Sequence, residues 1–213
     1  MATVSIIPSK APNLPIAPVE YSQQYIDQFN NALRLYFAQV DNCTQGTIAN
    51  ILSLTTNYGA WHDLSTQTAT LTTVVYPVQI GGVADYVRNF SIVTGVNGPT
   101  QMTAVTAGLY NFQYSIQLSN PTASISNVTI WWRKNGVDLV NTSSTMGVMA
   151  KHGSINGLSI LSMNVFIQLA AGDNVELFWQ SDIAGCQILT IPAGTAPVLP
   201  VSPGVIVTVF AVA

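Results

Sequence analysis

The sequence predicts a mainly β fold, an antiparallel jelly-roll sandwich preceded by an extended arm and one α-helix. Three observations predict this fold. Beyond residue 57 the apolar residues recur with a period of two, which is typical of strands that bury one face. Between Tyr21 and Asn42 they recur at helical spacing, without Gly or Pro. Residues 1–20 hold four prolines, which disfavour a helix or a central strand.

The arm, residues 1–20, is more apolar than a flexible linker needs to be. We therefore expect it to anchor the chain by docking on a partner surface, and a frayed terminus is the alternative. The candidate anchoring residues are Ile6, Ile7, Leu14 and Ile16.

The second segment, residues 21–57, is expected to be a helix followed by a linker. Its apolar residues follow alternating steps of three and four, which is the a/d pattern of helices that share a seam. The stripe could equally pack on its own domain, and we favour a self-associating bundle because the rest of the chain also looks oligomeric. Beyond Cys43 the helix could extend weakly, until Asn57-Tyr58-Gly59 ends it. The seam residues are Ile26, Phe29, Leu33, Tyr36 and Val40.

The third segment, residues 58–213, alternates in the manner of a sandwich domain. In the run 110–118 each apolar residue is followed by a polar one. Asn135-Gly136 suits a type I′ hairpin, and Gly172-Asp173-Asn174 suits another turn. Trp131 and Trp132 must point to opposite faces of one strand, so one belongs to the core. Trp131 is our candidate for a surface contact, although the pattern alone does not decide between the two.

The last strand, from Val205, differs from the others because it is apolar on both faces. In a single sandwich one face meets the core, and the other face needs a second subunit to cover it. We therefore expect an oligomer contact at Val205, Val207 and Val209.

The composition also indicates an oligomer. Only 7% of the residues are Asp, Glu, Lys or Arg, against about 25% in ordinary soluble domains, while 48% are apolar. Ser, Thr, Asn and Gln must solvate such a surface, or other subunits must cover part of it.

With six basic and nine acidic residues, the chain has no basic patch for nucleic acid. No apolar run is long enough for a membrane helix, and no secretory signal is recognisable, so we expect synthesis in a cytoplasm.

Motifs that carry catalysis or metal binding are not recognisable. His62 and His152 are far apart and lie in no metal-ligand spacing, and we expect His62 in a loop. No GxSxG elbow accompanies a potential triad, and a glycosidase carboxylate pair would be set by geometry that spacing does not reveal. We therefore expect no enzyme activity, no cofactor and no metal.

The order of elements resembles the tumour necrosis factor-like jelly roll, which is also used by complement-type globular heads. The resemblance covers about three quarters of the chain. The chain looks most similar to the version of this fold in virion proteins of tailed phages, including those of cyanobacteria. The motifs that carry it are Trp61-His62-Asp63, Gln67-Thr68-Ala69, Tyr76-Pro77-Val78, residues 107–112, residues 131–137, residues 169–177 and residues 205–209.

The resemblance implies a homotrimer on the exterior of a virion, packed around a threefold axis. The first hypothesis is a capsid decoration protein or head fibre that binds the major capsid protein or another virion protein. The second is a short tail fibre or receptor-binding tip that recognises a host glycan, and the third is a glycan-processing enzyme. A shaft of about 20 residues is short for a receptor-binding fibre, which slightly favours the first.

Overall fold

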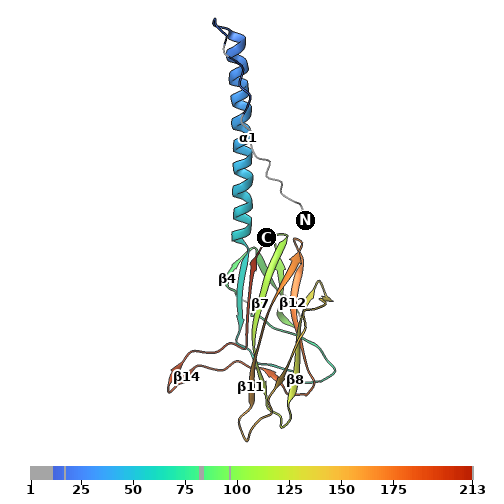
Figure 1. Ribbon diagram of the computed structural model, residues 1–213. Coiled ribbons are helices and arrows are strands. Elements are labelled where there is room, and N and C mark those ends of the chain that lie inside the picture. Colours follow the sequence, from blue (N-terminus) through green and yellow to red (C-terminus); the bar gives the residue numbers. More distant parts are fainter. Residues whose placement is uncertain (1–11, 17, 82–83, 96, 213) are drawn as a thin grey trace. The chain divides into compact units, whose positions relative to one another are not determined.

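The structure is a computed structural model that describes residues 12–16, 18–81, 84–95 and 97–212, with the backbone alone for residues 49–56 (Figure 1). Contacts divide the chain into one unit that ends at Thr55 and another that begins at Thr56. Residues 12–16 and 18–20 of the arm contain neither helix nor strand, and Leu14 and Ile16 are exposed. The anchoring candidates Ile6 and Ile7 lie outside the described residues.

The helix, α1 (Gln23–Thr56), is longer than the sequence pattern suggested. The helix does not end near Asn42 but continues without a break through Gly46. The hydroxyls of Thr44 and Thr47 donate to backbone carbonyls of the preceding turn at 2.9 Å. Asn57 ends it, because its side chain is buried and bonded to Tyr110 and Asn89 of the β unit. The five seam residues are all half-buried.

Two antiparallel sheets form a jelly-roll-like sandwich. In sheet A the strand order is β11-β7-β16-β1-β4, and β13 and then β2 continue from the far end of β7. The bounds are β1 (Tyr58–Asp63), β2 (Gln67–Thr68), β4 (Ala84–Arg88), β7 (Gly108–Asn120), β11 (Gly157–Leu169), β13 (Gln187–Ile188) and β16 (Val205–Ala211).

Sheet B has the order β10-β8-β12-β6-β5, with β3 beside β12 and β9 beside β8. A separate hairpin of β14 (Gly194–Thr195) and β15 (Val198–Leu199) extends away from the sandwich (Figure 1). The bounds in sheet B are β3 (Tyr76–Pro77), β5 (Phe90–Gly95), β6 (Gly98–Ala104), β8 (Ser126–Lys134), β9 (Val137–Asp138), β10 (Ser144–Val148) and β12 (Asn174–Ser181).

Aromatic rings from both sheets fill the core. Phe112 of sheet A lies 5.1 Å from Trp132 of sheet B, measured between ring centroids. Gly59 leaves room for the indole of Trp61, because a Cβ there would come within 1.9 Å of the ring. The core therefore depends on close backbone approach as well as on apolar content.

The hairpin turn at Asn135-Gly136 is confirmed in detail. Both residues have positive φ, 48° and 79°, as a type I′ turn requires. Of the tryptophan pair, Trp132 is fully buried, whereas Trp131 is half-buried on the other face of β8.

The last strand corrects one prediction. Val205, Val207 and Val209 point into the chain's own core, with at most 2% of each residue exposed. They therefore cannot form the subunit contact, and the prediction for these three side chains is wrong. Its physical reason is that both faces of β16 are apolar, so composition alone could not identify the inward face. The outward residues include Ile206 and Phe210, which are 43% and 45% exposed.

Candidate functional site

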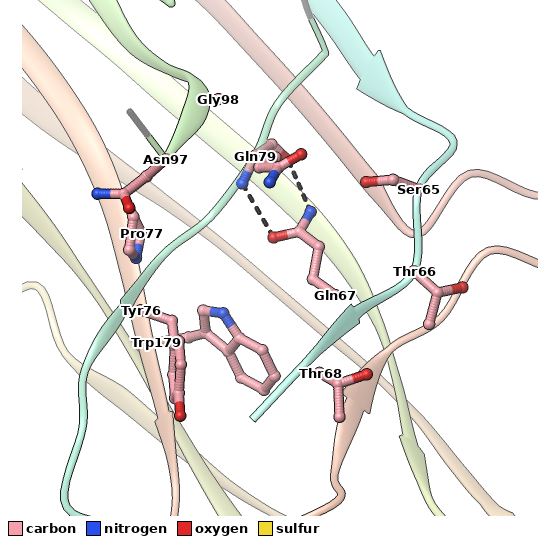
Figure 2. A pocket seen from close by; sticks show the side chains of 10 residues that line it. All are labelled: Ser65, Thr66, Gln67, Thr68, Tyr76, Pro77, Gln79, Asn97, Gly98 and Trp179. Atoms are coloured by element: carbon pink, nitrogen blue, oxygen red, sulfur yellow. Dashed lines mark hydrogen bonds between the residues drawn. The ribbon is translucent and has the colours of Figure 1, made fainter. Parts of the chain in front are cut away.

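The structure offers two candidate sites, a pocket and a sheet face. The pocket, here called the β2–β3 pocket, has a volume of about 490 Å³. It lies where the chain crosses from β2 in sheet A to β3 in sheet B. Its lining comes from residues 65–68, Tyr76, Pro77, Gln79, Asn97, Gly98 and Trp179 (Figure 2).

Gln67 ties the two sides of this pocket together. Its side-chain amide donates to the carbonyl of Gln79 and accepts from the amide N–H of Gln79, both at 2.9 Å (Figure 2). The side chain thus does what a neighbouring strand would do for the Gln79 backbone. The buried carboxylate of Asp63 accepts hydrogen bonds from Gln67 and from Ser65, so it fixes this corner further.

Two aromatic rings form one end of the pocket. The centroids of Tyr76 and Trp179 are 5.9 Å apart, with the ring planes inclined by 45°. The Tyr76 hydroxyl accepts from the N–H of Leu71 at 2.9 Å, which holds its ring in place. The indole N–H of Trp179 is buried and makes no hydrogen bond with any described residue.

The second candidate is the outer face of sheet A, defined as the side of β11, β7, β16 and β1 that points away from the core. β7, β11 and β16 contain no Asp, Glu, Lys or Arg. Phe166 is 62% exposed and Tyr58 41% exposed on this face. The strand register aligns one row across the sheet, consisting of Phe166, Asn111, Phe210, Tyr58 and Arg88.

The same face is polar in its middle and apolar again near its far end. Two residues further along each strand, Asn164, Gln113 and Thr208 form the next row on this face. Beyond that row, Leu158 and Ile160 of β11 are more than half exposed. β11 is also an edge strand, because β7 is its one hydrogen-bonded neighbour among the described strands.

Charged groups lie at the border of the face. His62 is in β1 and not in a loop, which corrects that expectation, and its Nδ1 lies 2.8 Å from Asp85 of β4. Within the described part of the chain, no group of three or more His, Cys, Asp or Glu side chains could hold a metal ion. None of the described helices is long and apolar enough to cross a membrane.

Trp131, the candidate surface contact, lies on the outer side of sheet B. Its indole N–H donates to Asp138 at 2.7 Å, and Arg133 donates to the same carboxylate at 2.7 Å. These bonds, that from Arg133 first, hold the pKa of Asp138 below its ordinary value. The Arg133 guanidinium also stacks 3.8 Å from the centroid of Phe178, so this cluster is already internally satisfied.

The sequence pointed to the last strand as a contact but to its inward side chains, and it did not indicate the pocket. The pocket residues are ordinary polar residues separated by more than a hundred positions, from Ser65 to Trp179, and no motif joins them. A search for protein-family models finds none that matches the chain, and no curated protein matches it either.

Proposed function

We propose that this chain is a non-enzymatic structural protein that self-associates, as a homotrimer, on the exterior of a virus particle. In this role it is a capsid decoration protein or a head fibre. The observation that carries the self-association is the partly aromatic outer face of sheet A, whose strands β7, β11 and β16 hold no charged residue.

The argument for self-association begins with β11. Its 13 residues leave one edge without a hydrogen-bonded strand among the described residues, and Leu158, Ile160 and Phe166 are 56%, 59% and 62% exposed on it. A long apolar edge without charged residues invites pairing with other chains, and proteins usually protect such edges with Lys or Pro. A defined subunit contact on this face would remove the hazard and bury the exposed aromatic row.

The helix supports the same proposal. At 34 residues, α1 is well above the length of about 12–15 residues below which isolated helices are marginal. The five seam residues are only half-buried in the single chain. Neighbouring helices of the same assembly would cover these side chains.

The threefold order and the virion location come from the resemblance to tumour necrosis factor-like virion proteins. Light scattering after size exclusion tests the first, and we expect a mass of about three times 22.7 kDa. A monomer mass across micromolar concentrations would contradict self-association.

Labelling of intact particles with an antibody against the chain tests the location. Labelling over the whole head supports a decoration protein or head fibre. Labelling at the tail would favour a short tail fibre or receptor-binding tip in its place, and no labelling would contradict the virion role.

A further inference from the structure

We infer that the β2–β3 pocket is a binding site for a neutral saccharide. This inference goes beyond the proposed structural role and does not rest on it. The volume of about 490 Å³ falls within the range of roughly 300–1,000 Å³ that is typical of ligand pockets.

The first argument is the unpartnered donor of Trp179. Buried N–H groups are almost always hydrogen-bonded, because leaving one without a partner costs free energy. The Trp179 indole N–H has no partner among the described residues, although the residue is 1% exposed. In Figure 2 its nitrogen lies on the side of the ring that faces Gln67 and Gln79, toward the polar part of the pocket. A ligand hydroxyl that reaches this donor would accept its hydrogen bond.

The second argument is the combination of an aromatic end with a ring of neutral polar groups. A pyranose ring has a face of C–H groups that packs on aromatic side chains and hydroxyls that both donate and accept. Tyr76 and Trp179 supply the aromatic end. Hydroxyls and amides that can pair with sugar hydroxyls come from Ser65, Thr66, Thr68, Gln79 and Asn97.

The third argument concerns charge. No lining residue carries a formal charge, since the lining consists of Ser, Thr, Gln, Asn, Gly, Pro, Tyr and Trp. A nucleotide or an acidic sugar would bring phosphate or carboxylate groups, for which this lining offers no cation. The chemistry therefore favours an uncharged ligand.

The fourth argument is that the site is held in shape before a ligand arrives. Gln67 is fixed by its two bonds to Gln79 and by Asp63. The Gln79 side chain lies against Gly98, where a Cβ would come within 3.0 Å of its amide carbon and where φ is +92°. Gly98 thus leaves the space that Gln79 occupies, and little ordering is needed on binding.

The test is calorimetric titration of the full chain with four neutral trisaccharides: maltotriose, cellotriose, mannotriose and N,N′,N″-triacetylchitotriose. We expect saturable binding of at least one, with a Kd between about 10 μM and 1 mM. In nitrogen-edited NMR spectra, one indole signal should shift on saturation, and it should be the signal that Trp179→Phe removes.

Gln79→Ala and Asn97→Ala should each weaken this binding by about tenfold or more. Both side chains are at least partly exposed, and Gln79→Ala keeps the backbone bonds to Gln67, so the fold should survive. The matched control is Gln101→Ala, which removes an amide from β6 outside the pocket. This control should bind like the parent.

Three results would overturn the inference. They are no binding of any of the four sugars up to about 10 mM, equal binding by the pocket variants and the parent, and binding of charged saccharides alone. Light scattering on the same samples measures the mass of the assembly, so that sugar binding and self-association are tested separately. A monomer that binds sugar would contradict the trimer only, and a trimer that binds none would contradict the pocket only.

Discussion

Val207 and Ile206 are adjacent in β16, yet they lie in opposite surroundings. Val207 is fully buried between its strand neighbours Trp61 and Tyr114, whereas Ile206 is 43% exposed. We predict that Val207→Asp unfolds the domain at neutral pH, because a buried unpaired carboxylate costs more than about 4 kcal/mol. Val207→Ala should cost about 2 kcal/mol, and Ile206→Asp should leave the domain folded. Urea denaturation followed by circular dichroism measures all three, and a folded Val207→Asp would contradict the core placement.

Asp173 joins two hairpin turns and gives a pH prediction. Its carboxylate lies 2.7 Å from the Lys134 ammonium and accepts from the Asn135 side chain and the Ala170 N–H, also at 2.7 Å. These bonds, that from Lys134 first, lower the pKa of Asp173 from 3.8 to about 2. A lowered folded-state pKa means that the stabilisation is present above pH 3.8 and is lost as the pH falls toward 2.

We therefore expect Asp173→Asn to melt at a lower temperature than the parent at pH 7, by a few degrees at most because the carboxylate is partly solvated. The two proteins should converge near pH 2. Differential scanning calorimetry over this pH range checks it, and a difference that grows toward acid would contradict the assignment.

These residues show what a sequence discloses at this scale. Asn135, Gly136 and Asp173 were predictable as turn residues because their conformations depend on neighbours close in the chain. The β2–β3 pocket was not predictable, because Gln67 and Trp179 come together through strand pairing in two different sheets. For the same reason the inward face of β16 could not be identified from its own apolar residues.

At the scale of elements, the length of α1 changes what its apolar stripe can do. The alternating steps of three and four that begin at Ile26 continue beyond Val40 to Cys43 and Thr47 and, in sequence, to Leu54. From sequence alone the stripe is clear only before Asn42, because the later positions are less apolar and Gly46 lies among them. The full repeat is long enough to form a seam with other helices.

We predict that Leu33→Lys, a charge placed on this seam, weakens self-association while helix content in circular dichroism remains that of the parent. Asn31→Lys is the control, because Asn31 is exposed and lies on the face of the helix opposite the seam. Sedimentation velocity measures the assembly. If Leu33→Lys keeps the parent's mass but lowers its melting temperature, the stripe packs on its own chain.

At the scale of the whole molecule, the structure shows where the chain places its many uncharged residues. Part of the apolar excess lies in the core, and part lies on the outer face of sheet A, where β7, β11 and β16 carry no charged residue. The polar middle of that face is made of Asn, Gln, Ser and Thr, which can bond to water or to another subunit. The chain therefore combines both explanations of its composition, solvation by neutral polar groups and a surface suited to a partner.

Phe166 and Phe210 allow the assembly surface to be tested without disturbing the core. They flank the buried Asn111 in the row that crosses the outer face and come from different strands, β11 and β16. We predict that Phe166→Asp and Phe210→Asp each yield a folded monomer, because a carboxylate in an apolar contact must be desolvated beside the same carboxylate of the neighbouring subunits. Their melting curves should remain cooperative, since both side chains are about half exposed in the single chain.

Val137→Asp is the matched control, because Val137 is 68% exposed in β9 of sheet B, away from this face. Light scattering should then give the parent's mass for the control and one third of it for the two variants. If both variants keep the parent's mass, the subunits meet on another surface, and the outer face of sheet A is not the contact.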